Sequence, residues 1–83
     1  MPTVAVVDGV KIQFYPRDHP PPHFHAEFAE YRAIFDIRSL SMVAGSLPEA
    51  KRRSVIAWAS TRKEVLLATF AKAISKQRLD QLP

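Results

Sequence analysis

The segment Arg17-Asp18-His19-Pro20-Pro21-Pro22-His23-Phe24-His25-Ala26-Glu27-Phe28 carries the strongest structural signal in the chain. Its three prolines fix their own φ angles and keep the preceding residues out of helical conformation, so they predict a stiff loop. After Pro22, polar and apolar residues alternate, which is typical of a strand buried on one face. The inner face then holds Phe24, Ala26 and Phe28, and the open face holds His23, His25 and Glu27. A rigid loop that leads polar groups onto a strand indicates a functional site.

The composition describes one small domain. The 83 residues are enough for a single hydrophobic core. Cysteine is absent, which excludes a disulfide framework, thiol catalysis and cysteine–zinc sites. No apolar run is long enough to span a bilayer, and the N-terminus lacks the pattern of a signal peptide. We therefore expect a cytoplasmic protein with no membrane partner.

Charge is distributed unevenly along the chain. Residues 1–47 contain four Lys/Arg and five Asp/Glu, whereas residues 48–83 contain eight and three. A basic second half suits a polyanion or an acidic protein partner. A solvated helix face explains the same charges equally well.

Two strands are expected before the proline loop and two after its strand. Residues 4–7 and 10–15 are rich in β-formers, and Asp8-Gly9 between them is the dipeptide most typical of a tight hairpin. Alternation resumes over residues 31–37, and a brief strand is expected over residues 41–44. Residues 3–44 therefore predict a small antiparallel sheet of four to five strands.

The second half of the chain predicts two helices within residues 47–76. Ser46-Leu47-Pro48-Glu49 matches a capping-box start, and Thr61-Arg62-Lys63-Glu64 matches a second one. Residues 60–63 interrupt the apolar stripe, so two helices are favoured over one, and residues 77–83 are expected to fray. The predicted fold is a single α+β domain over residues 1–83, with both helices on one face of the sheet. Its expected core consists of Val10, Ile12, Phe14, Phe24, Phe28, Phe35, Val55, Trp58, Leu66 and Phe70.

An Asp-His-x-Pro-Pro-His-x-His signature falls on Asp18, His19, Pro21, Pro22, His23 and His25. With the opening Met-Pro-Thr, Trp58 and the Glu64-x-Leu66-Leu67 helix, it resembles a family of small bacterial proteins classed as a domain of unknown function. The similarity covers almost the whole chain. The chain departs from such proteins at three positions. It has Ala29 where glycine is usual, Phe70 where tryptophan is usual and Arg17 where asparagine is usual. The resemblance implies a gene beside that of a second small protein, in a toxin–antitoxin arrangement, and it implies no catalytic residues.

The histidines of this signature suit acid–base chemistry. Imidazole transfers protons near neutral pH, and RNA supplies its own nucleophile, the 2′-hydroxyl. His23 and His25 are the predicted acid–base pair of a metal-independent ribonuclease, and His19 is a substitute for either. Alternatively, Asp18 and His19 hydrogen-bond within the loop, and His23 satisfies a backbone carbonyl. The candidate substrate-binding residues are Arg17, Tyr15, Lys11, Arg32, Lys51, Arg52 and Arg53.

Metal binding is a second hypothesis for the same residues. His23 and His25 lie on one side of a strand about 7 Å apart at Cα, close enough to share an ion. Glu27, Asp18 or His19 is then the third ligand. Two histidines at this spacing are a weak signal alone, so metal-free chemistry, with no cofactor, ranks first.

A binding module is the third hypothesis, because the open sheet face and the sheet edges suit a protein partner. The overall expectation is a toxin-like protein that acts on RNA in complex with a small antitoxin-like protein encoded nearby. The alternative is a non-catalytic protein-binding or regulatory module. A homodimer is compatible with both.

Overall fold

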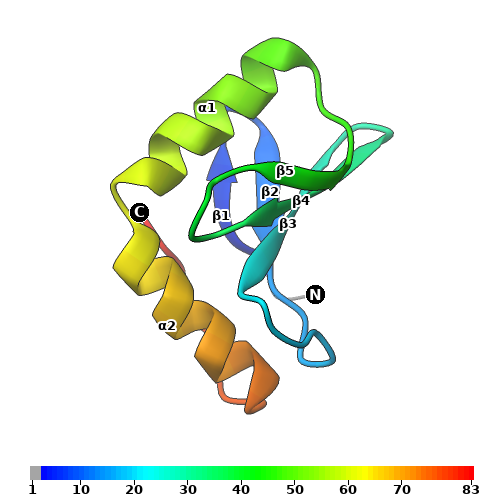
Figure 1. Ribbon diagram of the computed structural model, residues 1–83. Helices are drawn as coiled ribbons and strands as arrows, with labels where there is room; N and C mark the ends of the chain where they lie inside the picture. The colour runs from blue at the N-terminus through cyan, green and yellow to red at the C-terminus, as the bar shows by residue number, and fades with distance from the viewer. Residues whose placement is uncertain (1–2) are drawn as a thin grey trace.

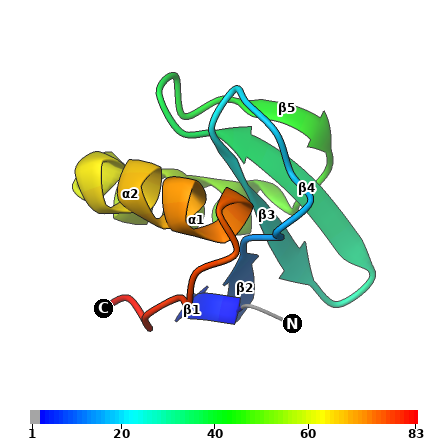
Figure 2. The same cartoon turned by 90° about the horizontal axis from the view of Figure 1, so that it is seen from below.

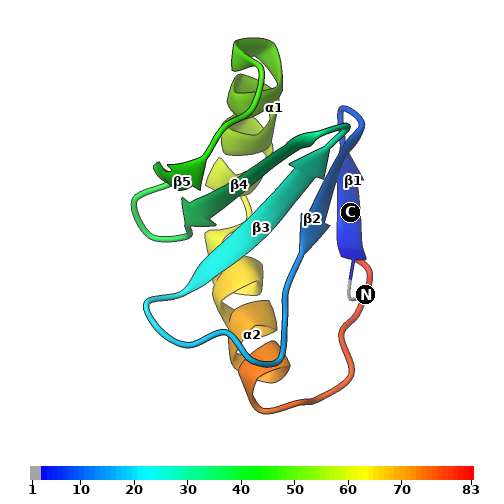
Figure 3. The ribbon, with the colours of Figure 1, turned by 90° about the vertical axis from the view of Figure 1, so that its right-hand side faces the viewer.

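The computed structural model describes residues 3–83 as a five-stranded antiparallel sheet followed by two helices, which confirms the predicted α+β fold (Figure 1). The sheet order follows the chain, β1-β2-β3-β4-β5. Both helices cover the same face of the sheet, and the other face is left open (Figures 2 and 3). No helix within residues 3–83 is long and apolar enough to cross a membrane. The elements are β1 (Thr3–Val7), β2 (Val10–Gln13), β3 (His23–Phe28), β4 (Tyr31–Asp36), β5 (Met42–Gly45), α1 (Glu49–Ser60) and α2 (Lys63–Ile74).

Two tight turns set the register of the first four strands. Asp8 and Gly9 have φ angles of 50° and 81°, so the expected hairpin between β1 and β2 is confirmed. Ala29, in the turn between β3 and β4, also has a positive φ of 52°. The first turn pairs Val7 with Val10, and the second pairs Phe28 with Tyr31 and so places His25 opposite Ile34. The proline loop joins β2 to β3, where Gln13 pairs with His25.

The core lies between the sheet and the helices. All the expected core residues are buried except Phe28 and Trp58, which are partly buried and pack against the others. Phe24 of β3 and Phe35 of β4 stack at 5.3 Å between ring centroids. On the open face, neighbouring side chains bury Gln13 and leave it 4% exposed.

Both predicted capping boxes are wrong, although the break between the helices is confirmed. The residue before α1 is Pro48, the residue before α2 is Arg62, and neither makes a side-chain capping hydrogen bond. The backbone N–H of Ser46 instead donates to the carbonyl oxygen of Arg32, which extends the sheet. Thr61 ends α1, and its hydroxyl donates to the carbonyl oxygen of Trp58.

The C-terminal tail, for which fraying is expected from the sequence, lies against β1 and the helices (Figure 3). The backbone N–H of Leu82 donates to the carbonyl oxygen of Val4 at 2.7 Å. The indole N–H of Trp58 donates to the carbonyl oxygen of Pro83 at 2.8 Å. The tail therefore covers the β1 edge of the sheet.

Asp8 connects the first hairpin to α1, and its replacement by asparagine should lower stability in a pH-dependent way. The hydroxyl of Ser54 donates to its carboxylate at 2.9 Å, and Lys51 Nζ lies 3.2 Å from it. The hydrogen bond from Ser54 and the charge of Lys51 lower the pKa of Asp8 below its ordinary value of 3.8. A lowered folded-state pKa stabilises the protein above pH 3.8 and loses that effect as pH falls through the folded-state pKa.

Thermal denaturation of Asp8→Asn should therefore give a slightly lower Tm than wild type at pH 7. The difference should disappear as pH falls below the folded-state pKa of Asp8, where its carboxyl group is protonated in both the folded and the unfolded state. Asparagine keeps the turn, because it tolerates a positive φ. Glu30→Gln, in the exposed turn between β3 and β4, removes the same charge and is the matched control. Equal decreases in Tm for the two variants would mean that the loss comes from the change in net charge and not from the contacts of Asp8.

Candidate functional site

The proline loop between β2 and β3 is anchored at both ends and carries Asp18 back toward the sheet. Phe14 is fully buried at its start, and the backbone N–H of Asp18 donates to the carbonyl oxygen of Tyr15. At its end, the backbone N–H of Ile37 donates to the carbonyl oxygen of Pro22 at 3.1 Å. The loop is thus fixed beside the first residues of β3.

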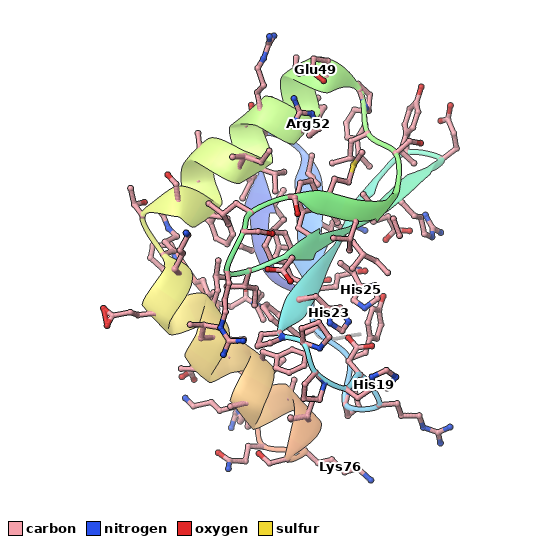
Figure 4. All side chains as sticks on the ribbon, in the orientation of Figure 1. His19, His23, His25, Glu49, Arg52 and Lys76 are labelled. Carbon is pink, nitrogen blue, oxygen red and sulfur yellow. The ribbon has the colours of Figure 1, made fainter. Side chains whose placement is uncertain are left out.

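Asp18 gathers two histidines around one carboxylate oxygen. Its Oδ2 atom lies 2.9 Å from Nε2 of His25 and 3.3 Å from Nε2 of His23. The two imidazole rings are 5.4 Å apart at their centroids. The three side chains are 17% to 25% exposed, so they are half-buried but accessible. Figure 4 shows the two histidines side by side, at the end of the sheet that faces the proline loop.

His23 lies between two hydrogen-bond acceptors. Its Nδ1 is 2.8 Å from the carbonyl oxygen of Pro21, and its Nε2 faces Asp18. A carbonyl oxygen only accepts, so Nδ1 carries a proton, and a second proton or a cation at Nε2 completes the contact with the carboxylate. The ring also packs 5.4 Å from Phe70 of α2, a packing role that the alternation of β3 does not reveal.

His25 is held by different neighbours. The rings of His25 and Tyr15 pack edge to face, with 4.6 Å between their centroids and 86° between their planes. The Tyr15 hydroxyl donates to Oε1 of Gln13 at 2.7 Å. Burial, followed by the charge of Glu27, raises the pKa of Tyr15, so its hydroxyl keeps its proton at neutral pH. Tyr15 and Asp18 together fix the orientation of His25.

The other predicted residues around the loop lie outside this cluster. His19 is in the exposed part of the loop, with Nδ1 3.3 Å from the carbonyl oxygen of Pro20 (Figure 4). Arg17 is exposed and borders a hollow beside α2. Glu27 forms an ion pair with Arg32 at 2.7 Å, and Lys11 lies opposite Glu27 in the register of β2 and β3.

The three basic residues of α1 lie away from the histidines. Lys51 pairs with Asp8, and its Nζ also sits 4.8 Å above the ring of Phe28. Arg52 hydrogen-bonds Glu49, which raises the pKa of Arg52 and lowers that of Glu49. Arg53 is exposed on the same helix. Figure 4 places Glu49 and Arg52 at the upper end of the molecule, well away from His23 and His25 near its middle, so one small substrate cannot contact both groups.

Asp18, His23 and His25 could also hold a metal ion. Their ligating atoms lie within 4.8 Å of one another, and two imidazoles with one carboxylate suit Zn²⁺ or a similar divalent ion. The hydrogen bond between His23 and Pro21 is of the kind that orients a histidine ligand. The third member is Asp18, not Glu27. The sequence offers Glu27, Asp18 or His19 as the third ligand, and the place of Asp18 in the signature is the signal that favours it.

Comparison with known proteins identifies one family. The family model described as "Domain of unknown function (DUF4160)" matches residues 9–71, which include all of the cluster and most of both helices. No curated protein and no solved structure matches the chain. The match assigns no activity, so a function has to be argued from the geometry of the site.

Proposed function

Since the chain belongs to this family of unknown function, we propose from its site that it cleaves RNA by metal-independent proton transfer at Asp18, His23 and His25. The observation that carries the proposal is that one carboxylate oxygen contacts both imidazole rings. Their other neighbours give the two histidines different environments, because Nδ1 of His23 faces the carbonyl oxygen of Pro21 whereas His25 packs against Tyr15. An acid–base reaction needs this difference, because one group must give a proton while the other takes one.

His25 is the base in this mechanism. Its Nε2–H donates to Asp18, which leaves the lone pair of Nδ1 to take the proton of the 2′-hydroxyl. The 2′-oxygen then bonds to phosphorus as the bond from phosphorus to the 5′-oxygen breaks. His23, protonated on both nitrogens between Pro21 and Asp18, gives its Nε2 proton to the departing oxygen. The products are a 2′,3′-cyclic phosphate and a free 5′-hydroxyl.

Arg17 and Arg32 are the proposed phosphate-binding residues. Both are exposed, Arg17 on the loop that carries Asp18 and Arg32 on β4, the strand next to the histidines. A guanidinium beside the phosphate stabilises the charge that grows on its oxygens during the reaction. The chain as a whole has a net charge of +4, which favours association with RNA.

The biological role that we propose is that of a bacterial toxin acting on cytoplasmic RNA, bound to a small antitoxin-like partner. This part rests on the resemblance given by the signature from Asp18 to His25. RNA cleavage gives a toxin its means of arresting growth, and a protein partner that covers the cluster would prevent it.

The test uses the purified chain and a mixed RNA substrate in excess EDTA. We expect cleavage that leaves 2′,3′-cyclic phosphate ends, because no metal takes part. Expression of the chain should arrest growth, and co-expression of the product of the neighbouring gene should relieve it. Intact RNA both in EDTA and with added divalent ions would refute the ribonuclease proposal.

Metal binding is the second candidate, and the convergence of three ligating atoms within 4.8 Å favours it. In that case Zn²⁺ should raise the Tm of wild type, since a ligand that binds only the folded state stabilises it. Asp18→Ala should abolish that rise. Cleavage that disappears in EDTA and returns with Zn²⁺ would favour this candidate over metal-free proton transfer.

A further inference from the structure

The open face of the sheet contains a hollow of about 300 Å³ directly beside His25. Both helices cover the opposite face of the sheet, as the ribbon in Figure 3 shows. Strand register aligns Gln13, His25, Ile34 and Ala44 in one row across four strands. All four border the hollow, so its floor includes two small or aliphatic side chains and its sides carry polar groups.

A chain of hydrogen bonds forms the polar rim of this hollow. The Tyr15 hydroxyl donates to Gln13, and Nε2 of Gln13 donates to Oε1 of Glu27 at 3.4 Å. The other carboxylate oxygen of Glu27 pairs with Nη1 of Arg32 at 2.7 Å. Each oxygen of Glu27 therefore has a protein partner that holds it in place, and each retains a second lone pair for a ligand.

We propose that this hollow binds a guanine base of the RNA substrate. The inference rests on the proposed function and assigns the base preference of the proposed ribonuclease. Unpaired RNA bases are recognised by aromatic side chains and by hydrogen bonds to their Watson–Crick edges, and Tyr15 and His25 supply the aromatic side chains here. The volume lies at the lower end of the range for ligand sites, which suits one base and excludes a large ligand.

Glu27 selects guanine because a carboxylate offers two adjacent acceptors and no donor. Guanine carries two adjacent donors on its Watson–Crick edge, the N1–H and the N2 amino group. Adenine and cytosine carry a donor beside an acceptor, and uracil carries one donor between two acceptors. The ion pair with Arg32 holds the Glu27 carboxylate in a fixed orientation. Because His25 borders both the hollow and the cluster, a bound guanosine brings its own phosphate to the acid–base pair.

The experiment measures nucleotide binding without any cleavage. Guanosine 3′-monophosphate and cytidine 3′-monophosphate are titrated into the isotope-labelled chain, and backbone amide shifts are followed by NMR. We expect the guanine nucleotide to bind at least roughly tenfold more tightly, as a bidentate contact to a base provides. The largest shifts should fall on Tyr15, His25, Glu27 and Ile34. Absence of binding, or equal affinity for the two nucleotides, would overturn the proposal.

Two variants and one control test the residues themselves. Glu27→Gln should lose most of the preference for guanine, because an amide offers only one acceptor. Ile34→Trp fills the hollow and should remove the binding of both nucleotides. Glu30→Gln removes a carboxylate from the adjacent exposed turn and should bind like wild type. A Glu27→Gln variant that folds and keeps the full preference would refute the role of Glu27.

The outcome is separable from that of the ribonuclease test. Selective binding without cleavage would keep the guanine site and reject the acid–base proposal. Cleavage without any preference for guanine would keep the acid–base proposal and reject the guanine site.

Discussion

Replacing Gly45 with alanine should abolish cooperative folding. Gly45 is the last residue of β5 and has a φ of +79°, a conformation that costs an L-residue about 1–2 kcal/mol. An added Cβ would also overlap the carbonyl oxygen of Arg32 and lie 2.8 Å from the Cα of Ala33. These are backbone atoms of β4, so the clash can be relieved only by separating the two strands. A domain of this size has about 3–5 kcal/mol of stability, and the combined cost should exceed it.

Gly9→Ala is the matched control for this prediction. Gly9 has an almost identical φ of +81°, but an added Cβ would make only ordinary contacts, at 3.5 Å to the Phe28 ring and 4.0 Å to Lys51 Nζ. The control should therefore lose about 1–2 kcal/mol and still unfold cooperatively. Urea denaturation followed by circular dichroism measures both variants. If the two variants unfold at the same urea concentration, the close approach of β5 to β4 is wrong.

The strands were predictable because their determinants are local. Asp8-Gly9 specifies a tight turn, and the alternation in residues 23–28 and 31–37 assigns each side chain to a face. The break between the helices was also predictable, because polar residues interrupt the apolar stripe there. These features depend on spacing within a few residues and need no knowledge of distant contacts.

The features that were missed depend on contacts between distant residues. Ser46 matches a helix cap in sequence, but its backbone N–H extends the sheet by bonding to Arg32. The tail looks unstructured, yet Leu82 donates to Val4, at the opposite end of the chain. Local preferences cannot reveal such competition, because tertiary contacts decide it.

Only part of the candidate site was predictable, because local alternation places the two histidines but not Asp18. Alternation placed His23 and His25 on one face of β3, and this is where they lie. Asp18 reaches both rings only because the proline loop folds back, and sequence spacing gives no measure of that path. The basic residues of α1 suited RNA equally well by sequence, but Lys51 pairs with Asp8, and Arg52 lies beside Glu49, well away from His23 and His25 (Figure 4).

Replacing His25 with alanine should lower RNA cleavage roughly a hundredfold or more, because the proposed base is removed. His23→Ala should cause a similar loss, since the proposed acid is then missing. The double variant should be little worse than either single variant, because residues that act as a unit are not additive. Single-turnover cleavage of one RNA, in EDTA, measures all three. His23→Ala also removes a contact with Phe70, so its thermal unfolding must be measured alongside.

Two further variants separate proton transfer from a structural role. Asp18→Asn keeps the size of the side chain but replaces an acceptor with a donor at one position, so His25 loses its fixed orientation and cleavage should fall. His19→Ala is the matched control, because His19 lies in the same loop but outside the cluster, and it should retain nearly full activity. If His19→Ala loses as much activity as His25→Ala, the loop as a whole is needed and the assignment to His23 and His25 is wrong. If His23→Ala and His25→Ala both fold and cleave RNA like wild type, the catalytic groups lie elsewhere and the cluster serves the architecture of the loop.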